Sequence, residues 1–224
     1  MKTIRSSILC FVVLLLAAPL LRGQDLFKYR HFTFGMSVTR VLERTDQKMA
    51  DVKVIHSRPA LIQELTWWPP NLPGTSFRSD TVEQILFSFY NGALYKISVS
   101  YDQTSTEGLT AEDMVKSISA KYGPPTNIAL EIDSATNERY EVRQKPVASW
   151  EDSQYSFNLV RSSFTNGLEL VIYSKRVNAE AEVAIANALK SEEEAGPQRE
   201  AERQKKQTDD LEAKRQKNQK SFRP

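Results

Sequence analysis

The sequence predicts an α+β fold in which helices pack on one face of an antiparallel sheet. Two stretches rich in strand-forming residues contain the same phrase, Phe-x-Asn-Gly: LFSFYNGALYKISV at 86–99 and SSFTNGLELVIYS at 162–174. Asn-Gly between apolar runs is a strong signal for a β-hairpin. An amphipathic helix with a capping residue precedes each phrase. We therefore predict two tandem helix-plus-hairpin units, followed by a charged C-terminal tail that is helical or disordered.

Residues 1–23 have the pattern of a secretory signal peptide. Two basic residues precede 14 uncharged residues, from Ile8 to Leu21, a run shorter than the roughly 20 residues that a membrane-spanning helix needs. We expect cleavage after Gly23, with an uncleaved anchor as the alternative, and export to the periplasm or secretion. Cys10 is the only cysteine and lies in this run. The mature chain is therefore expected to have no disulfide, thiolate metal site or cysteine nucleophile.

Charge is nearly balanced outside the signal segment. The chain has 30 basic and 28 acidic residues, and three of the basic ones fall within residues 1–23. The body contains no basic stripe, so we expect no nucleic-acid partner. The last 12 residues differ, because five of them are basic and none is acidic. This end is expected either to touch an anionic surface weakly or to remain solvated without specific contacts.

The first unit is predicted to span residues 24–104. Ser37 can cap a helix that runs to Arg44. Alternation then predicts strands in DVKVIHS and ALIQELTWW, and the prolines of WWPPNLPG predict a loop. The apolar face of the helix is expected to consist of Val38, Val41 and Leu42.

The turn of the first hairpin allows two registers. A two-residue Asn-Gly turn pairs Phe89 with Leu94, whereas a three-residue loop over 90–92 pairs Phe89 with Ala93. Only the three-residue loop gathers the apolar residues on one face, and face matching fixes the register, so we predict that loop. Applied 75 residues further on, the same register predicts that the second hairpin turns Val160, Phe164, Leu168, Leu170 and Ile172 inward.

The second unit is predicted to span residues 105–190. Thr110 and Asp113 form a capping box for a helix that Gly123 ends. Strands are expected in NIALEID, ERYEVRQ and VASWED, before the second hairpin. A short closing helix over NAEAEVAIANALK should bury Val183, Ala186 and Leu189 and end at EEEAGPQ. The tail, 191–224, has no apolar a/d seam, so we expect no coiled coil.

Catalytic residues are scarce. His31 and His56 are the only histidines, and no metal-ligand or phosphate-binding motif is present. We expect no catalytic residue, no metal and no cofactor. Glu151 and Asp152 can cap a turn. They also support an alternative function, a carboxylate-dependent hydrolase that acts on an envelope polymer.

The stretch TWWPPNLPG has the strongest binding character. Trp67 and Trp68 point to opposite faces of a strand, so both cannot enter the same core. With Pro69 and Pro70, one indole can form a stacking platform for a sugar, a peptide or another protein, or the loop can fold back as a lid over the core. We add Trp150 to this set of candidate binding residues. A third possible function is a small apolar ligand carrier that uses the space between helices and sheet.

The order of elements, together with FTFGMSVTRVL and VKSISAKYGPPT, resembles small exported bacterial α/β modules. These are the outer-membrane assembly lipoprotein BamE (SmpA) type and the tandem fold of β-lactamase-inhibitor protein. GMSVTRV is similar to the Gly-Met-Ser/Thr motif at which a helix starts in these modules. The first unit lacks the Gly-x-Pro that would follow the helix, and a lipidated cysteine is absent. The resemblance implies a binding role in the envelope and carries over no functional residue, so we predict an exported, non-enzymatic interaction protein whose partner is an envelope protein or polymer.

Overall fold

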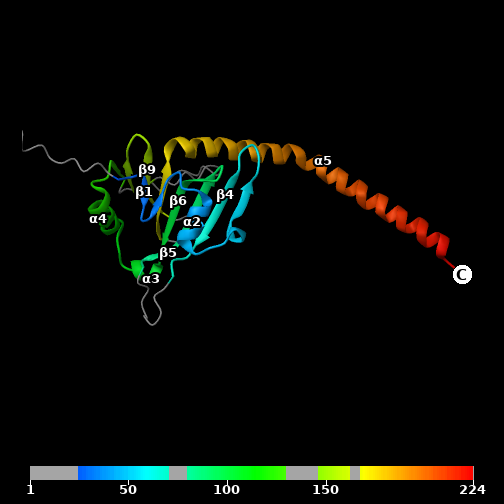
Figure 1. The fold of residues 1–224 in the computed structure, drawn as a ribbon, viewed down its shortest axis with the longest axis horizontal. Coiled ribbons are helices and arrows are strands. Elements are labelled where there is room, and N and C mark those ends of the chain that lie inside the picture. Colours follow the sequence, from blue (N-terminus) through cyan, green and yellow to red (C-terminus); the bar gives the residue numbers. More distant parts are fainter. Residues whose placement is uncertain (1–24, 71–79, 130–145, 162–166, 224) are drawn as a thin grey trace, which may run out of the picture.

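The computed structural model describes residues 25–70, 80–129, 146–161 and 167–223, and it has the predicted α+β fold (Figure 1). An eight-stranded antiparallel sheet with the order β3-β4-β5-β6-β10-β9-β8-β7 is its largest element. The sheet strands are β3 (Lys53–His56), β4 (Ile62–Trp67), β5 (Val82–Tyr90), β6 (Ala93–Tyr101), β7 (Asn127–Ile128), β8 (Ala148–Glu151), β9 (Tyr155–Arg161) and β10 (Leu168–Ser174). The remaining elements are β1 (Lys28–Tyr29), β2 (Phe32–Thr33), α2 (Val38–Thr45), the 3-10 helix η2 (Met49–Asp51), α3 (Gln103–Thr106), α4 (Ala111–Tyr122) and α5 (Lys175–Ser221).

The strand order confirms two tandem units. Helix α2 precedes the four strands β3 to β6, and α4 precedes the four strands β7 to β10. The last strands of the two units, β6 and β10, pair antiparallel and join the two halves into one sheet. The predicted signal peptide lies outside the described residues. Within the described part of the chain, every helix is too short or too polar to cross a membrane.

Both predicted helix starts are confirmed. The Ser37 hydroxyl accepts a hydrogen bond from the backbone N–H of Arg40 at 3.4 Å at the start of α2. Thr110 and Asp113 form the capping box of α4, and Gly123 follows the last residue with a φ of 85°. Each cap satisfies a backbone donor that the helix leaves free, worth about 1 kcal/mol.

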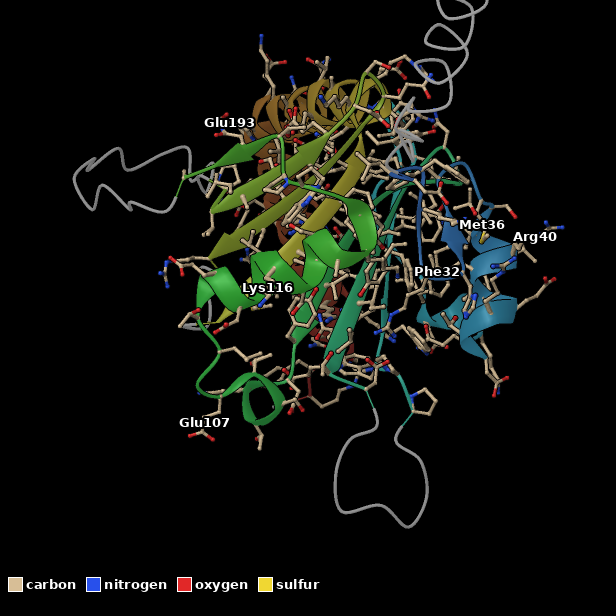
Figure 2. The ribbon with its side chains drawn as sticks, turned by 90° about the vertical axis from the view of Figure 1, so that its left-hand side faces the viewer. Phe32, Met36, Arg40, Glu107, Lys116 and Glu193 are labelled. Carbon is tan, nitrogen blue, oxygen red and sulfur yellow. The ribbon has the colours of Figure 1, made fainter. Side chains whose placement is uncertain are left out.

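The main core lies between the sheet and the two helices α2 and α4. The N-terminal hairpin β1–β2 lies between these helices and adds Tyr29 and Phe32 to the core (Figure 2). Its other members include Val38, Val41 and Leu42 of α2, Met114, Val115 and Ile118 of α4, and Phe87, Ile97, Phe157 and Ile172 of the sheet. The hairpin therefore connects the two helices, because Lys121 of α4 lies over the ring of Tyr29 and Arg44 of α2 donates to the carbonyl of His31.

Helix α5 packs on a separate, smaller cluster. Its buried residue Ala181 contacts Ile62 and Tyr95 of the sheet. These residues are not part of the main core that α2 and α4 cover. The prediction for this helix is wrong in its buried face, because Val183 is 62% and Leu189 55% exposed. Small side chains form the buried stripe instead, since they let the helix axis approach the tyrosines of the sheet: Ala181, Ala184 and Ala188.

The end of the closing helix also differs from the prediction. Helix α5 is 47 residues long, contains Pro197 in its interior and runs through the predicted boundary at 190–191 without a break (Figure 1). Proline removes one backbone donor and displaces the carbonyl of the residue four positions earlier. In this exposed stretch of helix, water can solvate that carbonyl. The tail is therefore helical, which is one of the two forms predicted for it.

The predicted three-residue loop of the first hairpin is wrong. Asn91 and Gly92 have φ values of 50° and 79° and form a two-residue turn, with Phe89 paired with Leu94. Positive φ at both central residues is the signature of a type I′ turn, which suits the twist of a hairpin. Beyond it, β6 contains one extra residue at Tyr95, and this bulge shifts the pairing. The bulge returns the apolar residues to one face, which the prediction had achieved by lengthening the turn.

The predicted register of the second hairpin is wrong as well. Val160 pairs with Glu169, and Ile172 pairs with Phe157. Phe164 lies outside the described residues, as do the whole phrase ERYEVRQ and the end of NIALEID. Strands β9 and β10 still occupy the same place in the second unit as β5 and β6 in the first. The repeated phrase therefore marks the equivalent hairpin without the same pairing.

Candidate functional site: a pocket beside Trp67

A pocket with a volume of about 910 Å³ opens where the first and second units meet the N-terminal hairpin. Its walls come from the β1–β2 turn, the last turn of α2, the end of β4 and the following loop, the start of β5, and the last turn of α4. The described residues that line it are Arg30, His31, Phe32, Arg44, Trp67, Pro69, Pro70, Asp80 and Lys121.

One wall is apolar and rigid. Phe32 packs against Trp67 edge to face, with ring centroids 5.9 Å apart, and against Phe87 at 4.5 Å. Trp67 is the last residue of β4 and is half-buried against this cluster, so it lines the pocket with a fixed orientation. Trp68 points away, is 57% exposed and does not line the pocket. The structure thus brings Trp67, Pro69 and Pro70 together and leaves Trp68 outside.

An ion pair closes the floor of the pocket. The guanidinium of Arg30 donates two hydrogen bonds to the carboxylate of Asp80, at 2.5 and 2.7 Å. This bond lowers the pKa of Asp80, and the backbone N–H of Val82, which also donates to the carboxylate, lowers it further. The pKa of Arg30 is raised by the same bond. Arg30 has a φ of 52°, a left-handed conformation that is strained for arginine and that the hairpin turn imposes.

Two further cations stand at the rim without a carboxylate partner. Arg44 donates to the backbone carbonyl of His31. The Lys121 Nζ lies 5.1 Å from the ring centroid of Tyr122 and 5.9 Å from that of Tyr29. Within the described ranges, neither cation lies within ion-pair distance of an acidic side chain. Both are in the last turn of their helices, where the helix dipole favours a positive charge.

Three tyrosines lie next to the ion pair. Burial raises the pKa values of Tyr29, Tyr101 and Tyr122, so all three hydroxyls stay protonated at neutral pH. The buried Tyr122 hydroxyl has no hydrogen-bond partner among the residues that the structure describes. A buried polar atom without a partner is uncommon in folded proteins and is expected to bind an ordered water or a ligand atom.

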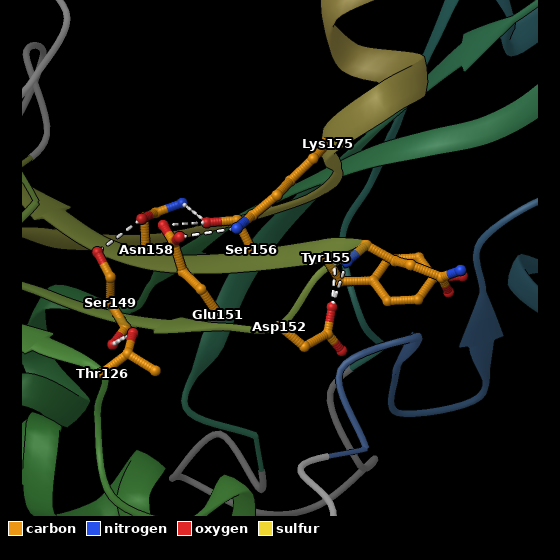
Figure 3. Close-up of polar contacts among 9 residues, drawn as sticks. Thr126, Ser149, Glu151, Asp152, Tyr155, Ser156, Asn158 and Lys175 are labelled. Carbon is orange, nitrogen blue, oxygen red and sulfur yellow. Dashed lines mark hydrogen bonds and ion pairs between the residues drawn. The ribbon is translucent and has the colours of Figure 1, made fainter.

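The burial of Trp150 gives its predicted binding role no support. Its side chain is 0% exposed, and its indole N–H donates to the carbonyl of Gly123 at 2.9 Å. It therefore belongs to the core and fixes the end of α4 to β8. The neighbouring Asp152 caps a turn, as one of the two interpretations predicted, by accepting from the backbone N–H groups of Gln154 and Tyr155 (Figure 3).

Glu151 belongs to a satisfied polar network (Figure 3). It accepts from Lys175 Nζ at 2.8 Å and from the Ser156 hydroxyl at 3.0 Å. Asn158 donates to Ser156 and accepts from the hydroxyl of Ser149, both at 2.8 Å. The bond from Lys175 lowers the pKa of Glu151, whereas a catalytic acid needs a pKa near the working pH. This network has the properties of a structural element and gives the hydrolase alternative no support.

The histidines contribute no recognisable centre. His31 enters the pocket lining through a turn, and His56 Nδ1 lies 3.4 Å from a carboxylate oxygen of Glu192 in α5. Among the described residues, no group of three or more histidine, cysteine or acidic side chains is arranged to hold a metal ion.

The fold and the pocket together define an α+β protein with a concave site at the junction of two repeated units. A family model, the TP0088 domain, matches residues 27–177, more than half of the chain. The chain belongs to this family. The matched range includes every residue that lines the pocket and excludes most of α5. No curated protein and no solved structure matches the chain.

Four charged pocket residues were missing from the sequence-based set: Arg30, Arg44, Asp80 and Lys121. Arg44 and Lys121 carried a weak signal, because each is the basic residue in the last turn of a predicted helix. Arg30 and Asp80 are 50 residues apart and carried no local signal. Only the packing of the N-terminal hairpin against the start of β5 brings them together.

Proposed function

We propose that the protein is an exported, non-enzymatic binding protein that contacts an envelope or secreted macromolecule through the pocket beside Trp67. The observation that carries this proposal is the pocket itself, which sets a half-buried indole and two prolines beside two cations that have no carboxylate partner among the described residues. Tryptophan and arginine are the residue types that most often dominate binding energy at protein interfaces. The signal-peptide pattern of residues 1–23 supports the compartment.

The alternatives draw less support from the same residues. The hydrolase requires an available carboxylic acid near Trp150, and Glu151 and Asp152 are both engaged in hydrogen bonds. The apolar ligand carrier requires space between the helices and the sheet, where Phe87 and Phe157 are fully buried in close packing.

A weak contact between the basic end of α5 and an anionic surface is a separate part of the proposal. Residues 214–223 are exposed, and this end leaves the body of the protein (Figure 1). Clustered lysine and arginine are attracted to anionic lipid by about 1 kcal/mol per residue near the surface.

Site-specific photo-crosslinking tests the binding proposal. A benzoylphenylalanine at position 68, exposed and adjacent to the pocket, should give a discrete crosslinked species in intact cells. Trp67→Ala should abolish it. The matched control is the same probe at Leu109, which is 51% exposed and does not line this pocket. The proposal fails if the product at position 68 survives Trp67→Ala, or if position 109 gives the same product.

The compartment has its own test. A reporter fused to residues 1–30 should be exported, and retention of the protein in the cytosol with residues 1–23 attached would contradict this part of the proposal.

A further inference from the structure

We infer that the pocket beside Trp67 binds a protein segment that carries carboxylates next to an apolar side chain. This inference rests on the proposed function of the same pocket and names the chemistry of its partner.

The charged side chains that line the pocket give it a net positive charge. Arg30 is neutralised by Asp80, with which it shares two hydrogen bonds. The positive charges of Arg44 and Lys121 are not compensated by an acidic side chain within the described ranges. A concave site with a net positive charge and an apolar wall focuses its field on anions.

The position of the two cations favours carboxylates over a phosphate group. Phosphate sites usually place backbone N–H groups of a helix N-terminus around the anion. This pocket instead receives the C-terminal turns of α2 and α4, where carbonyl dipoles disfavour a concentrated negative charge. One cation on each helix suits two separate carboxylates spaced along a chain.

The apolar wall explains why charge alone is not the complete ligand. Trp67 and Phe32 form a rigid aromatic surface, and Pro69 and Pro70 extend it at the rim. A pocket volume of about 910 Å³ lies in the range that ligand sites occupy, so it exceeds what one carboxylate fills. An apolar side chain between the carboxylates would bury its surface against the indole.

A protein segment fits these residues better than a glycan. A sugar site needs several neutral hydrogen-bonding side chains to recognise hydroxyl groups. Among the described residues, the pocket lining contains no asparagine, glutamine, serine or threonine, and the carboxylate that it does contain, Asp80, is already bound by Arg30. The available groups are aromatic, proline and cationic, which are those that anchor acidic protein segments.

The experiment is a titration of the ¹⁵N-labelled full chain, followed through the indole N–H of Trp67. The probe is the peptide acetyl-Asp-Glu-Phe-Glu-Asp-amide, and its neutral isostere is acetyl-Asn-Gln-Phe-Gln-Asn-amide. We expect the acidic peptide to shift the Trp67 signal with saturation and to bind about tenfold more tightly than the isostere, because two rim ion pairs each contribute a few-fold. This difference should shrink at high salt.

Two double variants of equal charge provide the matched control. Arg44→Gln with Lys121→Gln should weaken the acidic peptide about tenfold. Arg40→Gln with Lys116→Gln changes the same helices by the same charge, at side chains that are exposed and do not line the pocket (Figure 2). This second pair should leave the affinity within about twofold, because the removed charges are remote from the peptide.

Several results would overturn the inference. Equal binding of the two peptides would show that carboxylates are not recognised. Sodium phosphate that produces the same saturating shift would indicate a small-anion site, and tighter binding of a uronic-acid oligosaccharide would indicate a glycan site. Absence of binding by all probes would also reject the acidic segment. The effect of Trp67→Ala on the crosslink at position 68 tests the proposed function independently, since that experiment requires no assumption about the charge of the partner.

Discussion

Trp67 and Trp150 each end or nearly end a strand and stand next to charged residues, yet their surroundings differ. Trp67 is half-buried, and the cations near it, Arg44 and Lys121, lack acidic partners in the described part of the chain. Trp150 is fully buried, its N–H is bonded, and Glu151 beside it is paired with Lys175.

The difference shows which property distinguishes a binding site from a structural network in this protein. Both regions combine an indole with ionisable side chains, so residue type alone does not separate them. The network around Glu151 satisfies its polar atoms internally, and a partner could gain little from it. The pocket beside Trp67 leaves charge and aromatic surface available, and its contribution to folding is correspondingly smaller.

Tryptophan replacement should give the largest difference between the regions. Trp150→Ala should reduce the free energy of unfolding by about 3–5 kcal/mol, because it empties a fully buried site and leaves the Gly123 carbonyl without its donor. Trp67→Ala should cost about 1–3 kcal/mol, since part of its surface is already exposed. Urea denaturation followed by circular dichroism measures both. Equal costs would mean that Trp67 is as much a core residue as Trp150.

Disruption of the satisfied network should have the next largest effect. Asn158→Ala leaves the buried Ser149 hydroxyl without its acceptor and removes the donor to the Ser156 hydroxyl, which still donates to Glu151, and this should cost about 2 kcal/mol. Asn178→Ala is the control, because it removes an exposed hydrogen bond from the Asn178 side-chain amide to Glu182 and should cost less than about 0.5 kcal/mol. Similar losses for both variants, measured by the same denaturation, would show that the network is not a stabilising element.

The ion pair at the pocket floor should contribute a smaller, pH-dependent amount. Asp80→Asn should cost about 1 kcal/mol at pH 7, with allowance for solvent screening of this partly exposed pair. Because the folded-state pKa of Asp80 is lowered, its contribution is present above the unfolded pKa of about 4 and is lost as the pH falls through the folded pKa. The difference between wild type and variant should therefore shrink between pH 7 and pH 3. An unchanged difference across this range would exclude the ion pair as its source.

The rim cations should give the smallest effect on stability. Arg44→Gln with Lys121→Gln should change the free energy of unfolding by less than about 0.5 kcal/mol, because neither side chain has an acidic partner in the described ranges. Thermal denaturation of the double variant measures this directly. A loss above about 1 kcal/mol would assign these residues to folding and remove the contrast with Glu151.

Local sequence patterns were sufficient for the class of fold and for most of its elements. Ser37 and Thr110 cap helices through side-chain bonds to residues three positions away, so their roles depend on short segments alone. The presence of a hairpin at Asn91-Gly92 could likewise be predicted from the local phrase, although the predicted three-residue loop was wrong. The two-unit order could be predicted because the same helix and hairpin signals occur twice.

Tertiary structure decided the register, the length of α5 and the site. A bulge at Tyr95 shifts the pairing of β6 by one residue and so places its apolar side chains on the core face. A prediction that assumes regular pairing along the whole hairpin cannot include such a bulge. Arg30 and Asp80 form an ion pair although they are 50 residues apart in the sequence. Trp67 and Trp150 differ in how much of each ring the surrounding structure buries. A sequence determines by itself the interactions between near neighbours. The long-range packing that buries one indole, half-buries the other and leaves two cations without acidic partners among the described residues depends on how the whole sheet and its helices assemble.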